Sequence, residues 1–203
     1  MKEFLETLAA IQDEDSLIDF CRRHLLHGMP AVFAGRENDY YEFRKRIADK
    51  FSIGPHEVFI VGSAKLGFSP RKQKYFDLDS DIDTAIVSSK LYDSIMEQIY
   101  DYQMQLRKNR TAVSEYELNR YHQFLEYGAI GWMRPDKLPT AFRVKELRQD
   151  WFDFFNSISH GKSEVGNYEV SAGVFKSYRY LELYILSDMR SLRTNRQIGA
   201  VDV

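Results

Sequence analysis

The sequence predicts an α+β fold, in which a small group of β-strands is flanked by helical segments at both ends of the chain. Apolar residues recur at helical spacing over residues 2–26, 39–51 and 91–106. Between the second and third of these segments, Val58–Val61 and Asp81–Val87 are short apolar runs, the second rich in β-branched residues. Few strands among many helices are typical of a small sheet covered by helices.

Residues 1–53 are expected to form N-terminal helices. Asp15-Ser16 can cap a second helix within the apolar pattern of residues 2–26, so two helices are predicted there. A further helix runs from about Asp39 to Phe51. Gly54-Pro55 ends this helix, because neither residue favours its continuation.

Residues 54–110 form the central part of the chain, which carries the strands. Val58–Val61 has the pattern of a buried strand and leads directly into Gly62-Ser63. Residues 64–80 are mixed polar and basic, so they are expected to form a turn followed by a loop. Asp81–Val87 is the second strand, and the two strands enclose the most notable polar residues.

Residues 111–203 are expected to be mostly helical. Ser114 and Glu117 form a capping box at the start of one helix. Two more helices are predicted over 140–158 and 176–193, with one possible core strand at 168–175 between them. All 203 residues are therefore interpreted as a single unit with helical extensions.

The composition indicates a cytoplasmic protein that does not depend on a membrane or on a polyanion. Lys and Arg total 28 against 30 Asp and Glu, a net charge of -2, so a nucleic-acid partner is not favoured. The single cysteine, Cys21, excludes a disulfide framework and a multi-cysteine zinc site. The acidic residues within Met1–Glu6 do not fit a signal peptide, and no apolar run is long enough to cross a bilayer.

Two aspartates in the second predicted strand indicate a metal site. Residues two apart in a strand face the same side, so Asp81 and Asp83 present their carboxylates side by side. Their mutual repulsion is unfavourable unless a cation neutralises it. Such oxygen ligands suit Mg²⁺, which also binds substrate phosphate oxygens. Gly62-Ser63 is expected to close the site, because glycine lets the backbone approach a ligand.

The alternating acids that begin at Asp77 have two other interpretations. An EF-hand calcium loop would require glycine and glutamate where this chain has Ile82 and Ser88, so that interpretation fails. An acidic surface loop fits Asp77 and Asp79, which precede the apolar run. For the two acids within the strand a bound cation is favoured, because unpaired charges are unfavourable there.

These residues resemble the signature of the DNA polymerase β-like nucleotidyltransferase superfamily. The matching segments are Val61-Gly62-Ser63, Gly67 and Ser80–Val87, all within residues 58–88. The resemblance implies a nucleotidyltransferase core, which is a mixed sheet flanked by helices. In this family two metal ions bridge the acids and a nucleoside triphosphate, while an acceptor hydroxyl attacks the α-phosphorus and pyrophosphate leaves.

The resemblance also implies roles for individual residues. Asp81 and Asp83 would be catalytic and would hold two Mg²⁺ ions, and Gly62 and Ser63 would contact the β- and γ-phosphates of ATP or another nucleoside triphosphate. Active members bring a third carboxylate from a later strand. In this chain the candidate is Glu169, near the start of the possible strand at 168–175.

The spacer between the glycine motif and the acidic motif is longer than is usual in the family. It is rich in basic residues, which are candidates for phosphate or acceptor contacts, with a solvated basic loop as the alternative. These residues are Lys65, Arg71, Lys72 and Lys74. Lys65 is favoured as a nucleotide-binding residue because it lies closest to Gly62-Ser63.

The resulting hypothesis is an enzyme that moves a nucleoside monophosphate, AMP by preference, onto a protein or small-molecule acceptor. Family analogy suggests a bacterial toxin–antitoxin or antiphage-defence setting, with a possible partner protein. The alternative is a non-catalytic module on the same fold that binds a nucleotide or a partner protein. Glu169 beside Asp81 and Asp83 would favour catalysis, and Glu169 pointing away would favour binding.

Several other residues are not assigned a role in the site. Arg22 and His27 have the spacing of a helical ribonuclease toxin, but position 23 is arginine and the paired aspartates would be left unexplained. This interpretation is therefore set aside. The five histidines form no evident metal cluster, and Trp132 and Trp151 are interpreted as core residues.

Overall fold

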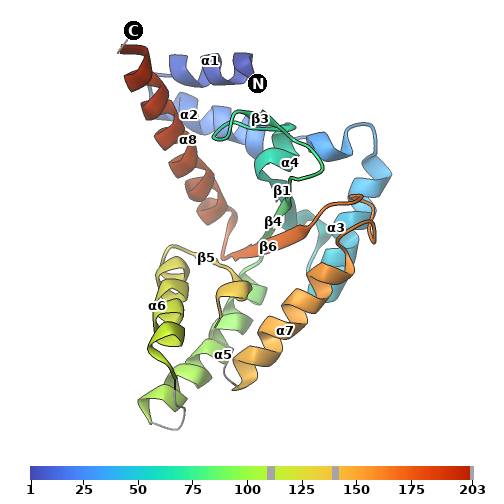
Figure 1. The fold of residues 1–203 in the computed structure, drawn as a ribbon, viewed down its shortest axis with the longest axis vertical. Coiled ribbons are helices and arrows are strands. Elements are labelled where there is room, and N and C mark those ends of the chain that lie inside the picture. Colours follow the sequence, from blue (N-terminus) through green and yellow to red (C-terminus); the bar gives the residue numbers. More distant parts are fainter. Residues whose placement is uncertain (109–112, 139–141, 202–203) are drawn as a thin grey trace.

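A computed structural model describes residues 1–108, 113–138 and 142–201, and it confirms the α+β class (Figure 1). Within these residues, four strands form one mixed sheet in the order β1-β4-β6-β5. The strands are β1 (Val58–Val61), β4 (Ile82–Val87), β5 (Trp132–Met133) and β6 (Val170–Phe175). A separate hairpin joins β2 (Phe68–Ser69) to β3 (Lys74–Tyr75).

The register of the sheet places Asp83 between two other strands. β4 pairs with β1 in the antiparallel sense, so that Asp83 lies opposite Val61. On its other side β4 pairs with β6 in the parallel sense, with Asp83 opposite Ser171. β5 is antiparallel to β6, and Trp132 lies opposite Phe175. Since β4 is paired on both sides, its position is fixed by two hydrogen-bonded ladders.

Helices cover both faces of the sheet, and each face has its own apolar core (Figure 1). The helices on the first face are α3 (Glu37–Phe51), α5 (Ser89–Arg107), α6 (Glu115–Ala129) and α7 (Phe142–Ser157). Those on the second face are α1 (Lys2–Ala10), α2 (Glu14–Cys21), a π-helical turn (Arg22–Leu26) and α8 (Tyr178–Val201). The short helix α4 (Gly62–Leu66) follows β1 at one end of the sheet.

Alternation along the strands decides which side chains enter which core. Ile82 and Ile86 of β4 belong to the core under α5 and α7, whereas Ala85 belongs to the core under α8. Because residues two apart share a face, Asp83 lies on the same side of the sheet as Ala85. Asp83 is therefore on the face that α8 covers, whereas Asp81 lies just before β4, which begins at Ile82 and not at Asp81 as expected from the sequence.

Two helix ends differ from the sequence-based expectation. Asp13, rather than Asp15-Ser16, caps α2, and its carboxylate accepts a hydrogen bond from the backbone N–H of Ser16. The last helix was expected to end near Arg193, but α8 continues to Val201. The apolar face of α8 packs on α1 and α2. These tertiary contacts stabilise a longer helix than the local sequence pattern predicts.

Other expectations for the C-terminal part are met. The capping box of Ser114 and Glu117 is confirmed at the start of α6. The start expected near Thr140 lies outside the described residues, and α7 is described from Phe142. In the parts of the chain that the structure describes, no helix combines the length and apolar character needed to span a bilayer.

Candidate functional site

The glycine motif and the two aspartates meet where β1 ends and β4 begins. Ser63, Asp81 and Asp83 line one small cavity of about 90 Å³. Gly62 is equally close, since a Cβ atom placed on it would lie 3.2 Å from Asp83 Oδ2. The structure thus brings together all four residues of the predicted motif, and their roles as ligands remain a prediction.

Gly62 occupies a backbone conformation that other residues avoid. Its φ of 65° lies in the left-handed region, which costs an L-residue with a side chain about 1–2 kcal/mol. The nearby Asp83 carboxylate leaves little room for a side chain in any case. Glycine at this position therefore lets the chain turn sharply from β1 into α4 beside the carboxylates.

The surroundings of Asp83 disfavour its negative charge. Although the side chain is open to the cavity, nearby protein atoms displace bulk water, and this desolvation raises the pKa of Asp83. The Ser171 hydroxyl, which donates to Oδ1 over 3.3 Å, opposes the rise, while the charge of Asp81 adds to it. A cation between the two carboxylates would relieve this unfavourable charge.

A second, larger cavity opens from the same place. It has a volume of about 360 Å³ and lies between the sheet and α8. Four residues, Ser63, Ser69, Lys72 and Asp83, line both cavities, so the two spaces meet at the carboxylate. Apolar and aromatic residues, among them Trp132, Phe175, Tyr184, Met189 and Leu192, line other parts of the larger cavity. A ligand with a polar end and an apolar end would match this division.

The structure corrects the interpretation of Lys65. Its side chain is 6% exposed, and its ammonium group donates hydrogen bonds to the carbonyl oxygens of His27 and Gly28. Lys65 lines neither cavity. Because α4 turns this side chain away from Asp83, its ammonium binds the end of the π-helical turn rather than a nucleotide phosphate.

The basic residues near the carboxylates come instead from the hairpin and from Arg134, which follows β5 and lines the larger cavity. Lys72 lines both cavities, Arg71 lines the larger one and Lys74 the smaller one. Arg71 also bridges to Asp188 on α8, with 3.2 Å between the guanidinium and the carboxylate. The long spacer therefore places cationic groups around the site, although not the one favoured from sequence.

The acidic loop before β4 behaves largely as expected. Asp77 accepts hydrogen bonds from the Ser80 hydroxyl and from the backbone N–H of Asp79. Lys74, and then Ser80, hold the pKa of Asp77 below its usual value. Asp77 lines neither cavity, which agrees with a surface role, whereas Asp79 lines the smaller cavity beside Asp81.

Glu169 does not join the paired aspartates. Its backbone carbonyl accepts a hydrogen bond from Ile82, so the chain passes close by, but its side chain is exposed and lines neither cavity. Within the described residues, no group of three or more acidic, histidine or cysteine side chains lies close enough together to share one metal ion. The side chain opposite Asp83 is instead Ser171, because Glu169 lies two residues earlier, before β6 begins.

Arg22 and His27 are both engaged in structural contacts. The Arg22 guanidinium and that of Arg179 each bind one oxygen of the buried Glu182 carboxylate, at 2.6 and 2.7 Å. His27 Nε2 lies 3.1 Å from the Tyr178 hydroxyl. Desolvation of Glu182 would raise the pKa of its carboxyl, but the two guanidinium groups outweigh it and hold the pKa below its usual value.

Comparison with known proteins adds no further constraint. The chain matches no protein-family model, no curated protein and no solved structure. The functional argument therefore depends on the motif residues and on the geometry of the two cavities.

Proposed function

We propose that the chain is a metal-dependent nucleotidyltransferase, which moves a nucleoside monophosphate from a nucleoside triphosphate to a protein or small-molecule acceptor. The single observation that carries this proposal is the convergence of Gly62, Ser63, Asp81 and Asp83 where the two cavities meet. Two carboxylates, a close backbone and adjoining cavities are what a triphosphate held through a cation requires. ATP is the preferred donor, by analogy with the family that the motif resembles.

The residues present fit magnesium as the metal. Asp81 and Asp83 offer hard oxygen ligands, and desolvation, to which the charge of Asp81 adds, raises the pKa of Asp83. Two protein carboxylates leave coordination positions for phosphate oxygens and water, as magnesium prefers. When bound, magnesium would supply electrostatic stabilisation of the charge that develops on the triphosphate.

The remaining groups of the site would orient the reactants. Lys72 lines both cavities, so its ammonium is placed to hold phosphate oxygens between the nucleoside and the leaving pyrophosphate. The glycine turn at Gly62 allows these oxygens to approach the backbone beside Ser63. Such positioning lowers the barrier, because the acceptor hydroxyl and the α-phosphorus no longer have to meet by chance.

A non-catalytic nucleotide-binding or partner-binding module is the second candidate. The observation that favours it is the position opposite Asp83, where a third carboxylate would be expected and Ser171 stands. The exposed Glu169 is consistent with the same interpretation. In either case, a bacterial toxin–antitoxin or antiphage-defence setting would provide the acceptor or the partner protein.

Label transfer from α-labelled nucleoside triphosphates with magnesium tests the proposal. Wild type should label an acceptor in a host-cell extract, and the Asp81→Asn/Asp83→Asn variant should lose at least 100-fold of this transfer. Asp77→Asn is the matched control, because it removes a nearby carboxylate that lines neither cavity. Saturable nucleotide binding without any transfer would establish the binding module instead.

A further inference from the structure

Three aromatic residues that contact one another, Trp132, Phe175 and Tyr184, line the larger cavity and are here called the aromatic wall. The centroids of the Trp132 and Tyr184 rings are 4.8 Å apart, and those of Trp132 and Phe175 are 6.0 Å apart with the rings nearly parallel. Tyr184 is 38% exposed and Trp132 is half-buried, whereas Phe175 is buried in the core, so Trp132 and Tyr184 are the open part of the wall. Trp132 packs against the core as the sequence suggested, but it is only partly buried and also lines the cavity.

A glycine in β6 makes room for the tryptophan. A Cβ atom on Gly173 would lie 2.4 Å from Trp132 Nε1, so the indole occupies the space that any other residue would fill. Among the described residues, the structure gives the indole N–H no hydrogen-bond acceptor. Trp132 therefore lines the cavity with its indole nitrogen lying over Gly173 of β6.

The wall and the carboxylate lie on the same face of the sheet. Ser171 is opposite Asp83, Gly173 is opposite Ala85, and Phe175 is opposite Trp132. Two residues of a strand span about 6.6 Å, so the wall lies one to two such steps from Asp83. This separation is comparable to the distance between the phosphates and the base of one nucleotide.

We propose that the aromatic wall of Trp132, Phe175 and Tyr184 receives the base and sugar of the nucleoside triphosphate, with Trp132 as the principal contact. This inference rests on the proposed function, since it assigns the nucleoside half of the same ligand. The indole and phenol rings offer stacking surfaces for a base, and the indole N–H can donate to a sugar or base oxygen or nitrogen. Trp132 would thus be a specificity-determining residue, because inorganic phosphates cannot use this wall.

Tryptophan fluorescence provides a direct test, since the chain has only two tryptophans. Trp151 lies on α7 in the core of the opposite face and is 4% exposed, so Trp151→Phe leaves Trp132 as the sole reporter. The probes are the non-transferable analogue α,β-methylene-ATP and inorganic triphosphate, which lacks a nucleoside. The analogue should quench Trp132 emission saturably, whereas inorganic triphosphate should bind without quenching.

Calorimetry on variants separates the ring from its N–H group. Trp132→Ala should weaken binding of the analogue about tenfold or more and leave inorganic triphosphate unaffected, since stacking on a base is lost. Trp132→Phe should retain most of the affinity that stacking provides. Gly173→Ala should weaken the analogue in the same way, because it displaces the indole, and Tyr100→Ala is a control for an exposed, remote aromatic.

The outcomes distinguish the two proposals. Quenching by the analogue together with the loss in Trp132→Ala supports the nucleoside site. Tight binding of the analogue with unchanged Trp132 emission and an undiminished affinity in Trp132→Ala overturns it and leaves the proposed function standing. If neither probe binds the wild-type chain with magnesium, the proposed function itself is overturned.

Discussion

At the scale of single residues, the site depends on a few positions where one side chain decides the local geometry. Gly62 must be glycine for two reasons, its left-handed backbone and its contact with Asp83. Lys65 and Glu182 are charged residues whose partners lie within the protein rather than in a ligand. Substitutions of Lys65 or Glu182 should therefore lower stability, whereas a substitution of Gly62 should also weaken ligand binding.

Gly62→Ala should impair nucleotide binding more than it impairs folding. The left-handed backbone costs about 1–2 kcal/mol with a side chain present, and the new Cβ would also crowd Asp83. Gly161→Ala is a matched control, because Gly161 has a φ of 79° with no atom within 4 Å of its Cβ position. Urea unfolding should give similar losses for both variants, while calorimetry with α,β-methylene-ATP should show a loss only for Gly62→Ala.

Glu182→Gln should destabilise the fold by about 1–3 kcal/mol, the usual range for hydrogen bonds to charged groups. The buried carboxylate binds both Arg22 and Arg179, and glutamine cannot replace both charge-assisted contacts. Glu14→Gln, which affects an exposed pair with Arg190, should cost less than about 1 kcal/mol. Equal losses in urea unfolding at pH 7 would contradict this assignment.

The Glu182 contacts also predict a pH dependence. The pKa of this carboxyl is lower in the folded chain than in the unfolded chain, so the folded state binds the proton less readily. The stabilisation that the Glu182 contacts provide is fully present above the pKa of the unfolded chain, about 4.3. It is lost as the pH falls from there through the lower pKa of Glu182 in the folded chain. The stability difference between wild type and Glu182→Gln, measured by urea unfolding, should therefore shrink as the medium is acidified below that value.

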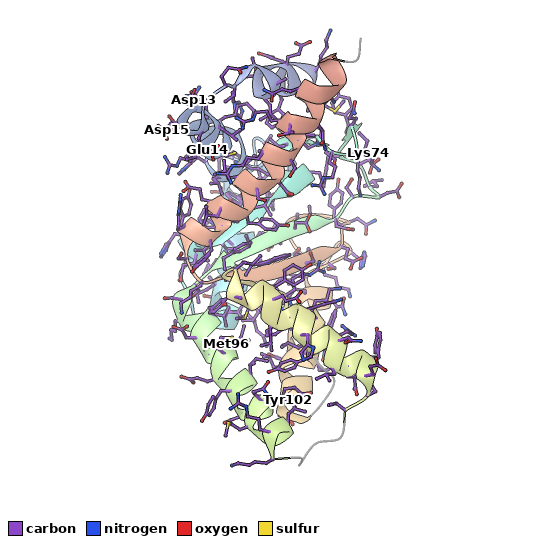
Figure 2. The ribbon with its side chains drawn as sticks, turned by 90° about the vertical axis from the view of Figure 1, so that its left-hand side faces the viewer. Asp13, Glu14, Asp15, Lys74, Met96 and Tyr102 are labelled. Carbon is purple, nitrogen blue, oxygen red and sulfur yellow. The ribbon has the colours of Figure 1, made fainter. Side chains whose placement is uncertain are left out.

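At the scale of elements, the start of α2 shows how local signals compete. Asp13, Glu14 and Asp15 lie together at this helix end (Figure 2). Only Asp13 has the extended backbone of an N-cap and accepts the hydrogen bond from Ser16. Asp13→Ala should cost about 0.5–2 kcal/mol in urea unfolding, and Asp15→Ala distinctly less, since it removes no capping bond. The reverse order would support the cap expected from sequence.

The elements that could be predicted are those with enough residues to show a period. The β1 and β4 runs and the helices α3, α5 and α7 were recognised because apolar residues recur along them. The hairpin of β2 and β3 and the edge strand β5 were missed, since two residues carry no periodic signal. The turn of the hairpin nevertheless supplies Lys72 to the site, and β5 supplies Trp132.

The site itself was predictable only where its residues are close in sequence. Asp81 and Asp83 both line the smaller cavity although Asp81 lies just before β4, and Gly62 comes directly after the last residue of β1. The direction of Lys65 depends on how α4 packs against His27, which sequence spacing does not reveal. Likewise, Trp132 faces the larger cavity because β5 pairs with β6, a contact between distant segments.

At the scale of the whole molecule, one sheet supports two cores and should unfold with both. β4 and β6 contribute side chains to each core, so neither core can be lost while the sheet remains intact. Each single-tryptophan variant reports on one face, Trp151→Phe through Trp132 and Trp132→Phe through Trp151. In each variant, the urea midpoint from tryptophan fluorescence should equal the midpoint from circular dichroism. Transitions that separate by probe would show that the two faces form independent units.

The single cysteine makes it possible to time how often the layer over the larger cavity opens. Cys21 is fully buried among α2 and α8, and this burial raises the pKa of its thiol to about 12. A thiol reagent can therefore react with Cys21 only when the helices transiently separate from the sheet, so the labelling rate measures how often this opening occurs. A ligand that contacts both Asp83 of β4 and Tyr184 of α8 would hold the sheet and the helix together and lower the rate of Cys21 labelling. A ligand confined to the smaller cavity would leave the labelling rate unchanged.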